Sequence, residues 1–454
     1  MSTVANNPVV GSIAARLERL PHSRWHVKVR VLIGAVTFFE AFDQLLAASA
    51  LPVLMDEWNL STGQATMAVT TGSIGMLFGA LGAGWLGDRI GRVRTVALGV
   101  ALTGLASLAV AASGNIEMFA LFRFLQGLGI GGVVPVAATY INEIARSDNR
   151  GRFVLLYEMI FPAGLSAATL VAVWVIPHYG WRAMFLIGAL PVLIAALLPR
   201  KVPESPRWLL AKGRTEEAEA VIAQIEREVE ESTHEPLPAP RAEIPDEKGT
   251  GRLADLFRGR YLRRTAVLSG LWFVAYYVNH GIATWLPSLY TDTFGLDLTT
   301  ALTFSLISNA TGLLGNFLMA LFIDRIGRRP SLIAALTGAS VALAVLAIVG
   351  ASSGPQVALF ASCTTFCIFA INAGLYLYSP ELYPTRNRAK GAAFGGLWNR
   401  LGVIIGPVVV GGIIAAGGSL RLVFAQLAVV AAVGAVIAFF AVETKGKTLE
   451  ELNS

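Results

Sequence analysis

The feature that most constrains the fold of this chain is a series of long apolar segments. Stretches of about 18 or more mostly apolar residues recur along the chain, each long enough to cross about 30 Å of hydrocarbon as a helix. Hydrophobic residues make up 54% of the 454 residues and charged residues only 15%. A single span in lipid must satisfy its own backbone hydrogen bonds, which selects helices, and the alternating pattern of a membrane β-barrel is absent. We therefore expect an all-α membrane protein.

Twelve spans are expected, in two groups of six. They fall at about 30–54, 66–87, 93–113, 117–143, 153–176 and 182–199, and then at about 265–291, 299–323, 330–350, 355–382, 389–416 and 420–442. The residues between the two groups are rich in charge and proline, and we expect two short amphipathic helices there. The predicted organisation is an N-terminal tail (1–28), a six-helix bundle (29–199), a linker (200–264), a second six-helix bundle (265–442) and a C-terminal tail (443–454).

A short basic turn with one acid occurs twice in the chain. Asp88-Arg89-Ile90-Gly91-Arg92 follows span 2, and Asp324-Arg325-Ile326-Gly327-Arg328 follows span 8, 236 residues later. At an offset of 238 residues, Glu381 matches Glu143 and Arg388 matches Arg150. Matches in register indicate two similar halves. In a membrane, such a repeat is typical of a transporter whose two bundles rock against each other.

The distribution of charge predicts the orientation of the chain. A net charge of +6 is compatible with nucleic-acid binding, but the basic residues gather in the turns on one side of the expected spans. This is the positive-inside pattern, so we expect no nucleic-acid partner and both termini in the cytosol. The chain shows no nucleophile–base pair, metal-ligand cluster or phosphate loop. We therefore expect no enzyme activity, no metal and no cofactor.

The motifs resemble those of the major facilitator superfamily over essentially the whole chain. The Asp88 turn and its repeat are similar to that superfamily's loop between spans 2 and 3, and Arg123-Phe124-Leu125-Gln126-Gly127 resembles its span 4 motif. Three segments narrow the resemblance to the branch of sugar porters, organic-ion transporters and bacterial niacin or aromatic-acid permeases: Pro203–Leu209, Pro380–Thr385 and Glu443–Gly446. This resemblance implies twelve transmembrane helices in two pseudo-symmetric bundles and transport by alternating access.

Acids within the spans are the candidates for proton coupling. Glu40-Ala41-Phe42-Asp43 resembles the acid-x-x-acid of span 1 in aromatic-acid:proton symporters, with Glu in place of the usual first Asp. Glu40 and Asp43 share one helix face, and two nearby carboxylates disfavour simultaneous ionisation. The resemblance also ties Arg123 to proton coupling, and Glu158 is a further candidate. The alternative for Glu40 and Arg123 is a structural ion pair.

The candidate substrate site centres on Arg400 in span 11. Its planar guanidinium suits a carboxylate, and it resembles the arginine that organic-anion transporters carry at this position. Its partner is either the substrate or a fixed acid such as Glu158. Rings that stack on a planar substrate and groups that hydrogen-bond to it are expected from Gln44, Tyr276, Tyr277, Asn279, Trp285, Tyr376, Tyr378, Trp398 and Asn399, with helix packing as the alternative.

The basic turns are expected to form a cytosolic gate. We expect Asp88 to pair with Arg150 or Arg152, Asp324 with Arg388, and Glu143 and Glu381 with Arg89 and Arg325. Such pairs would hold the inner side closed and break as the halves rock. The gating set is Asp88, Arg89, Arg92, Glu143, Arg150, Asp324, Arg325, Arg328, Glu381 and Arg388. The alternative is that these arginines only determine topology.

Together these features predict a proton-coupled symporter that imports a small planar organic anion across the bacterial inner membrane. Nicotinate is the first expected substrate and a benzoate-type acid the second. An organic cation, a sugar, drug efflux and a membrane sensor without transport remain alternatives, and Arg400 is the residue that separates an anion carrier from a sugar porter. We expect the chain to act as a monomer in the lipid bilayer.

Overall fold

The computed structural model describes residues 13, 15–21, 23–144, 159–239, 253–383 and 385–446, and every regular element in this part of the chain is helical. The first half contains α2 (Arg24–Glu57), α3 (Thr62–Ile90), α4 (Arg92–Ala111), α5 (Ile116–Ile144), α7 (Ile160–Tyr179), α8 (Trp181–Gly188) and α9 (Pro191–Lys201). The second half contains α12 (Gly259–Ala283), α13 (Leu286–Ser288), α14 (Leu298–Ile326), α15 (Arg328–Val349), α16 (Gly354–Glu381), α17 (Thr385–Ala415) and α18 (Leu420–Phe439). Between the halves lie α10 (Pro206–Ala211), α11 (Thr215–Thr233) and the 3₁₀ turn η2 (Leu253–Phe257).

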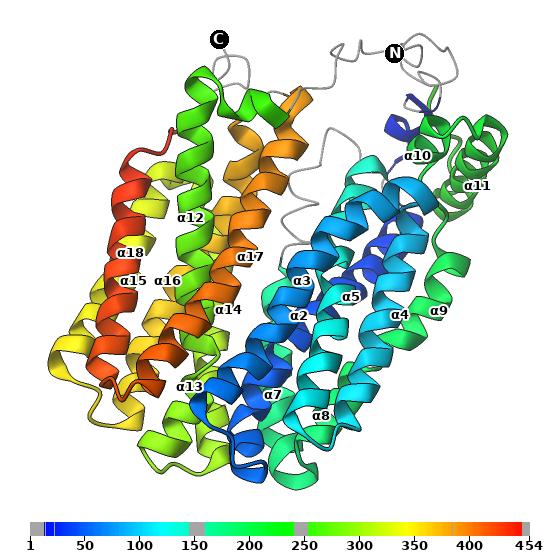
Figure 1. Cartoon of the computed structure of the whole chain (residues 1–454). Coiled ribbons are helices and arrows are strands. Elements are labelled where there is room, and N and C mark those ends of the chain that lie inside the picture. Colours follow the sequence, from blue (N-terminus) through cyan, green and yellow to red (C-terminus); the bar gives the residue numbers. More distant parts are fainter. Residues whose placement is uncertain are drawn as a thin grey trace.

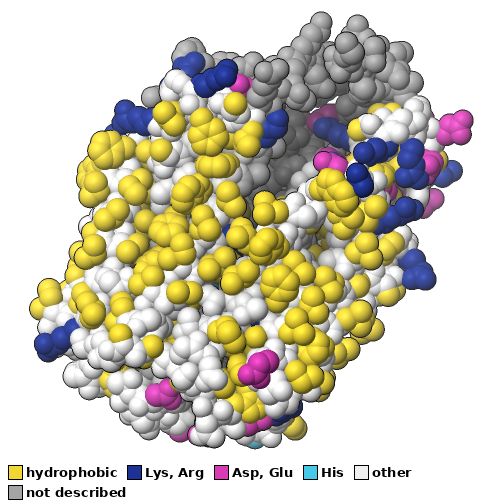
Figure 2. Space-filling view, in the orientation of Figure 1, with side chains coloured by type: hydrophobic (Ala, Val, Ile, Leu, Met, Phe, Trp, Pro, Cys, Tyr) yellow, Lys and Arg dark blue, Asp and Glu magenta, His cyan; other side chains and the backbone are white. Residues whose placement is uncertain are grey.

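The helices confirm the expected membrane fold. In the described residues, eleven helical segments are long and apolar enough to cross a membrane, with α8 and α9 together forming the sixth. The helix α12, whose first turns carry arginines and whose middle is aromatic and polar, completes the twelve. Hydrophobic side chains cover the outer surface as a broad band (Figure 2), and many of them are exposed, including Leu81, Leu105, Leu193 and Ile348. The chain is a multi-pass membrane protein.

Two of the expected spans are interrupted by proline. Pro191 has no N–H to continue the helix from α8, so the predicted span 182–199 is divided into α8 and α9. Pro287 similarly follows the end of α12, and the chain continues through α13 into a π-helical turn, η3 (Leu289–Thr293). The predicted span 265–291 is therefore not one continuous helix.

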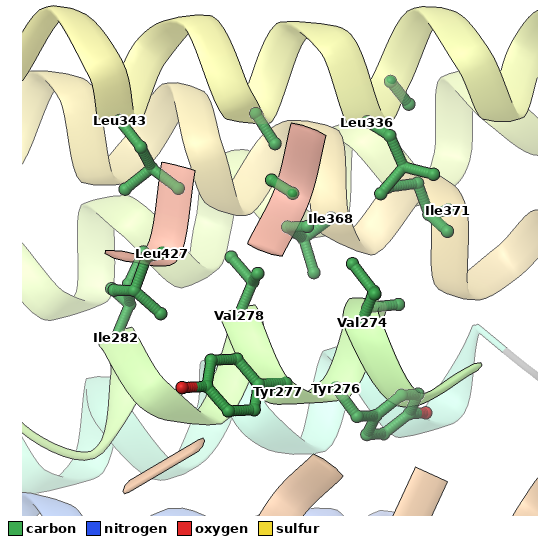
Figure 3. Close-up of a cluster of buried hydrophobic side chains, with 14 of the residues drawn as sticks. Val274, Tyr276, Tyr277, Val278, Ile282, Leu336, Leu343, Ile368, Ile371 and Leu427 are labelled. Atoms are coloured by element: carbon green, nitrogen blue, oxygen red, sulfur yellow. The ribbon is translucent and has the colours of Figure 1, made fainter. Parts of the chain in front are cut away.

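Helix packing repeats between the halves. In the first half α3 lies against α5, and α2 against α7; the equivalent pairs in the second half are α14 with α16, and α12 with α17. All five labelled residues of α12 belong to one buried cluster, but Figure 3 shows that they use different faces: Val274 and Val278 point toward Leu336 and Ile368, and Tyr276 and Tyr277 point to the opposite side of the helix. The second face of α12 is thus left for polar and aromatic contacts.

The two halves meet through α7 with α14 and α3 with α17. Asn309 of α14 donates to the Thr169 hydroxyl at 3.4 Å, and the Ser166 hydroxyl donates to the Asn309 carbonyl at 3.4 Å. Thr66, near the start of α3, lies beside Gly411, near the end of α17. Toward the end that carries α10 and α11, called the linker end below, the helices of the two halves diverge (Figure 1). In the described part of the chain, the helices of the two halves therefore lie farther apart at the linker end than at the opposite end.

The linker helices α10 and α11 pack against the first half. Ile13, Leu17 and Leu20 are buried in one apolar cluster with Ile222 and Ile225 of α11. The first described segment is therefore docked rather than extended, and α2 begins at Arg24 rather than near residue 30.

Ion pairs hold this segment to α11. Arg16 pairs with Glu226 at 2.5 Å and with Glu219 at 2.6 Å, and Arg19 pairs with Glu226 at 2.6 Å. Burial disfavours the ionised form of Glu226, but the hydrogen bonds from Arg16 and Arg19 outweigh it and hold the pKa of Glu226 below its ordinary value.

Glycine allows the closest helix contact in the first half. A Cβ on Gly75 of α3 would overlap the backbone carbonyl of Phe124 in α5, and one on Gly131 of α5 would overlap the backbone of Met76. Both glycines therefore let two helix backbones approach directly, as small residues do in membrane interfaces.

Gly75→Ala should destabilise the protein. The added methyl group meets backbone that cannot move aside, and overpacking of this kind costs about 1–3 kcal/mol. Gly82→Ala is the matched control on the same helix, because a Cβ there has no neighbour within 4 Å. Thermal unfolding in detergent should show a lower Tm for Gly75→Ala and an unchanged Tm for Gly82→Ala. Equal Tm values would contradict the close approach of α3 and α5.

Candidate functional site

A central cavity lies between the halves, and its empty space, open solvent included, is about 470 Å³. Its walls come from α2, α3, α5, α12 and α17. Polar or charged side chains that line it include Gln44, Ser73, Arg123, His280 and Thr284. Two of the residues expected from sequence, Gln44 and Arg123, therefore lie on this cavity. His280 and Thr284 were not among the predicted site residues, although they lie one and two turns beyond Tyr276 on the same face of α12.

A buried charge network forms one wall of this cavity. Arg123 donates to Asp43 Oδ2 at 3.3 Å and to Gln126 Oε1 at 2.6 Å, and the Gln126 amide donates to Asp43 Oδ1. All three side chains are at most 6% exposed. A Cβ on Gly72 would meet the guanidinium at 3.1 Å, so glycine makes room for it. The Asp43 carboxylate therefore has a cation on one oxygen and an amide on the other.

Gln126 is a functional candidate that the sequence analysis did not select. It follows Arg123 by three residues in the span 4 motif, so both residues lie on one helix face. That spacing was the signal that could have identified it. Gln126 closes the network because it accepts from Arg123 and donates to Asp43.

Glu40 and Arg400 lie next to the cavity, one turn nearer the linker end. Glu40 precedes Gln44 by one turn of α2, and Arg400 precedes Val403 by one turn of α17. Glu40 is 4% exposed, and neither of its carboxylate oxygens has a hydrogen-bond partner among the described residues. The charges of Glu40 and Arg400 act on each other across the boundary between the halves. In the described part of the chain, Arg400 makes no ion pair within 4 Å.

A second cavity, of about 400 Å³, lies between α7 and the helices α12, α14 and α16. Its walls combine aromatic rings with carboxamides, and the residues that matter here are Phe161, Tyr276, Asn279, Asn316, Phe369, Asn372 and Tyr376. Tyr276, Asn279 and Tyr376 were expected from sequence. Asn372 presents a buried carbonyl oxygen with no hydrogen-bond partner among the described residues. The lining therefore combines aromatic rings with a carboxamide oxygen that can accept a hydrogen bond.

Trp272 fixes the two tyrosines of this cavity. Its ring packs against Tyr376 at 4.9 Å and against Tyr276 at 5.6 Å, and its Nε1 donates to the Ser379 hydroxyl at 3.0 Å. Tyr276 in turn stacks on His280 at 5.9 Å, which connects the second cavity to the first. The sequence offered no reason to separate Trp272 from other packing aromatics.

Six predicted substrate residues do not line either cavity, and Arg400 is one of them. The Tyr277 hydroxyl donates to Gln426 of α18 at 2.9 Å, and the Tyr378 hydroxyl accepts from the Val442 backbone at 2.8 Å. Trp285 donates to the Pro407 carbonyl at 3.0 Å, and Trp398 packs against Phe273. Asn399 is buried beside Arg400 in α17 but does not line either cavity. These geometries fit the alternative of helix packing, because neighbouring positions on a helix point to different faces.

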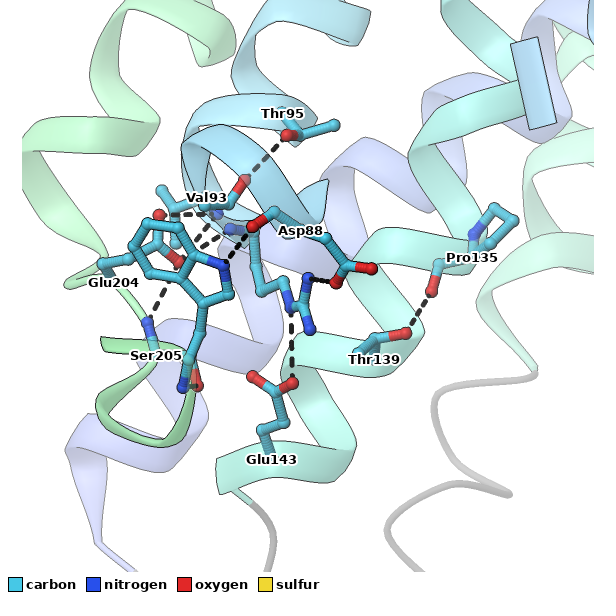
Figure 4. Close-up of polar contacts among 11 residues, drawn as sticks. Asp88, Val93, Thr95, Pro135, Thr139, Glu143, Glu204 and Ser205 are labelled. Atoms are coloured by element: carbon cyan, nitrogen blue, oxygen red, sulfur yellow. Dashed lines mark hydrogen bonds and ion pairs between the residues drawn. The ribbon is translucent and has the colours of Figure 1, made fainter. Parts of the chain in front are cut away.

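At the linker end, Arg92 interacts with three acids of the first half, Asp88, Glu143 and Glu204, which lie close together in Figure 4. Its guanidinium pairs with Asp88 at 2.5 Å and with Glu143 at 3.3 Å. Glu204 accepts from the backbone N–H of Arg92 at 2.8 Å, and Trp208 donates to the Asp88 carbonyl at 3.0 Å. Glu204 thereby satisfies donors at the start of α4, where a negative charge is favoured.

The second half repeats this arrangement. Arg328 pairs with Asp324 and with Glu381, both at 2.7 Å. Glu443 accepts from the backbone N–H groups of Arg328 and Arg329 at 3.0 Å. Burial disfavours the charged form of Glu443, but backbone hydrogen bonds from Lys445, Arg328 and Arg329 outweigh it and lower the pKa of Glu443.

The observed pairings correct some expected ones. Glu143 and Glu381 pair with Arg92 and Arg328, each within its own half, instead of Arg89 and Arg325. Arg92 and Arg328 are the first residues of α4 and α15, directly after the turns at Gly91 and Gly327, and this position brings each guanidinium to the acids of its own half. Arg89 stacks on the Trp85 ring at 4.1 Å, and Arg325 is exposed. Arg150, Glu158 and the side chain of Arg388 lie outside the described part of the structure.

Comparisons with known proteins agree with this architecture. A family model described as sugar (and other) transporter matches residues 28–454. The chain is 34% identical over 444 residues to the niacin transporter NiaP of Acinetobacter baylyi, covering 97% of this chain and 99% of that protein. It is 26% identical over 428 residues to the 4-hydroxybenzoate transporter PcaK of the same organism, covering 94% of this chain and 93% of that protein.

A solved structure gives the same fold. The xylose transporter XylE from E. coli, in a partially occluded inward-open conformation, aligns with a TM-score of 0.70 at 19% identity, covering 94% of this chain and 100% of that chain. The chain is therefore a transporter, not an enzyme, and it belongs to the sugar (and other) transporter family of the major facilitator superfamily.

Proposed function

We propose that this chain is a proton-coupled symporter that imports a small planar organic anion by alternating access, with nicotinate as the first candidate. It acts as a monomer in the bacterial inner membrane, with the linker end and both termini in the cytosol. The niacin and 4-hydroxybenzoate transporters among its relatives move planar aromatic acids or their amides, which supports this substrate class. A benzoate-type acid is the second candidate for the same reason.

The observation that carries the proposal is Arg400. Arg400 precedes the cavity-lining residue Val403 by one turn of α17, its charge acts on Glu40 of the other half, and it makes no ion pair within 4 Å among the described residues. A cation at membrane depth costs about 3 kcal/mol on insertion scales unless it is paired. The carboxylate of the substrate supplies the missing partner and matches the guanidinium fork. A sugar has no such charge, so the carboxamides of the second cavity alone do not make this a sugar site.

The second cavity holds the ring of the substrate. Tyr276, Tyr376 and Phe161 supply faces and edges for stacking, and Asn279 and Asn372 supply hydrogen bonds at the rim. The ring nitrogen of nicotinate accepts a hydrogen bond, which an asparagine amide can donate. Tyr276 of the second cavity stacks on His280 of the central cavity. We place the substrate across this junction, with its ring toward the asparagines and its carboxylate toward Arg400.

The acids of α2 couple this site to protons. Asp43 is held by Arg123 and Gln126, whereas both Glu40 oxygens lack a partner in the described residues and face Arg400. A protonated Glu40 leaves Arg400 to the substrate. When Glu40 loses its proton toward the cytosol, its negative charge competes for Arg400 and promotes release. Asp43 with Arg123, and Glu158, are the further candidates for the proton.

The arginine–acid networks at the linker end form the gate. Each network lies within one half in this open arrangement, built around Arg92 and around Arg328. We place Arg89 and Arg325, which are exposed here, where the two halves approach when the linker end closes. Exposed pairs can break and reform at low cost, which suits a gate.

Uptake in proteoliposomes tests the substrate and the coupling. Labelled nicotinate should accumulate when the outside is more acidic than the inside, and benzoate should compete while xylose and choline should not. Acidification supports uptake because the outer-facing acids must be protonated before substrate binds. Uptake that is indifferent to the pH gradient would reject symport, and competition by xylose alone would reject the anion.

Variants of Arg400 and Glu40 separate binding from coupling. Arg400→Gln should raise the KM for nicotinate about 10- to 100-fold, since a charge-assisted hydrogen bond contributes about 1.5–3 kcal/mol. Arg400→Lys should be intermediate because it keeps the charge and loses the fork. Glu40→Gln should keep nicotinate exchange but lose the dependence on pH. Arg421→Gln, an exposed arginine at the opposite end, is the control and should leave KM unchanged. An unchanged KM in Arg400→Gln would overturn the site.

Asp88→Asn tests the gate. It removes the ion pair with Arg92, and turnover should fall about fivefold, the scale of about 1 kcal/mol for a partly exposed pair. The KM for nicotinate should change little. Asp324→Asn is the matched change in the other half and should behave alike. A loss of binding without a turnover defect in either variant would count against gating.

A further inference from the structure

A basic and apolar surface lies at the linker end of the second half, outside the transport pathway described above. We name it the α12 platform and define it by Phe257, Arg258, Leu262, Arg263 and Phe440. Phe257, Leu262 and Phe440 are 44%, 52% and 54% exposed, and both arginines are exposed. The Arg263 guanidinium lies over the Phe440 ring at 5.8 Å, which joins the start of α12 to the end of α18.

The platform is held in place from beneath. Leu256 is fully buried, and its carbonyl accepts a hydrogen bond from the Thr265 hydroxyl at 2.8 Å. Arg264 turns inward and donates to the Leu382 carbonyl at 2.9 Å. The neighbouring acid, Asp255, receives a hydrogen bond from Asn387 at 3.5 Å and so faces α17. The exposed side chains therefore stand on a fixed backbone rather than on a loose loop.

The corresponding region of the first half shows what the platform lacks. There, Arg16, Arg19 and Lys28 meet the acids of α11, and Lys28 pairs with Glu228 at 3.3 Å. In the described part of the second half, Arg258 and Arg263 have no ion pair with an acidic side chain. A helix with acids covers the basic residues of the first half, and among the described residues no acidic helix covers Arg258 and Arg263 of the second half.

We propose that the α12 platform binds the phosphate headgroup of an anionic phospholipid, with its acyl chains against Phe257, Leu262 and Phe440. The observations favour a lipid over a soluble anion because positive charge and exposed apolar side chains occur together on this surface. Arginine forks suit phosphate oxygens, and the exposed apolar side chains suit the acyl chains. The bound lipid supplies the negative charge that α11 supplies to the first half.

Lipid binding to the purified full-length protein tests this proposal. The probe is phosphatidylglycerol titrated into phosphatidylcholine nanodiscs, with binding read by native mass spectrometry and by the rise in Tm. The double variant Arg258→Gln/Arg263→Gln should bind phosphatidylglycerol about ten- to thirtyfold more weakly than the unmodified chain. The control Arg200→Gln/Lys201→Gln removes the same charge from exposed residues at the same end of the first half and should bind normally.

Two further measurements distinguish a membrane phospholipid from a soluble phosphate as the ligand of the platform. Arg258→Lys/Arg263→Lys keeps both charges and the positive-inside pattern, so it should insert normally and retain most of the binding. Glycerol phosphate at millimolar concentration should not displace the lipid. The proposal is overturned if the double Gln variant binds as the unmodified chain does, if the control loses as much, if the Lys variant loses all binding, or if glycerol phosphate competes fully.

Discussion

The interaction on which this structure depends is the pairing of charges between helices inside the membrane. A buried carboxylate without partners is unfavourable in a low-dielectric interior, and removal of one member of a buried pair costs about 3–5 kcal/mol. Asp43 meets this requirement entirely within the first half, through Arg123 of α5 and Gln126 one turn later. The close approach of α3 and α5 at Gly72 and Gly75 makes that network possible, because larger side chains would occupy the space of the guanidinium and the backbone.

Glu40 and Arg400 show the opposite situation. Each comes from a different half, neither has a hydrogen-bonded partner among the described residues, and their charges act on each other only at a distance. A hydrogen-bonded ion pair such as Asp43 and Arg123 stabilises one arrangement of the helices. Glu40 and Arg400 lie on the two sides of the boundary between the halves, so a proton or an anion that binds between them changes their interaction. For this reason we propose that Asp43 and Arg123 partly stabilise the fold, and that Glu40 and Arg400 act in substrate binding and release.

Much of the fold could be predicted from the sequence, because it rests on long-range regularities. Apolar length sets the number of spans, and the Asp88 and Asp324 turns set the repeat. The details of the site were less predictable. Tyr276 and Tyr277 are adjacent and chemically alike, yet one lines a cavity and the other donates to Gln426, since successive helix positions differ by about 100°. Asn316 and Phe161 enter the site only because α14 and α7 converge on α12, which no local pattern reveals.

The arginines at the linker end illustrate how position changes the meaning of a charge. Arg92 and Arg328 lie four residues after an acid and at the start of a helix whose N–H groups a second acid accepts, so each is fixed by its own half. Arg258 and Arg263 lie at the start of α12, where α11 does not reach them, and they stand beside exposed apolar side chains. The same residue type therefore organises a helix junction in one place and faces the membrane surface in another.

The two halves are alike in their helices and differ in what neutralises their basic ends. The acids of α11 belong to the chain, so they are always present, whereas a lipid must bind from the membrane. The second half should for that reason be the half whose stability follows the composition of the membrane.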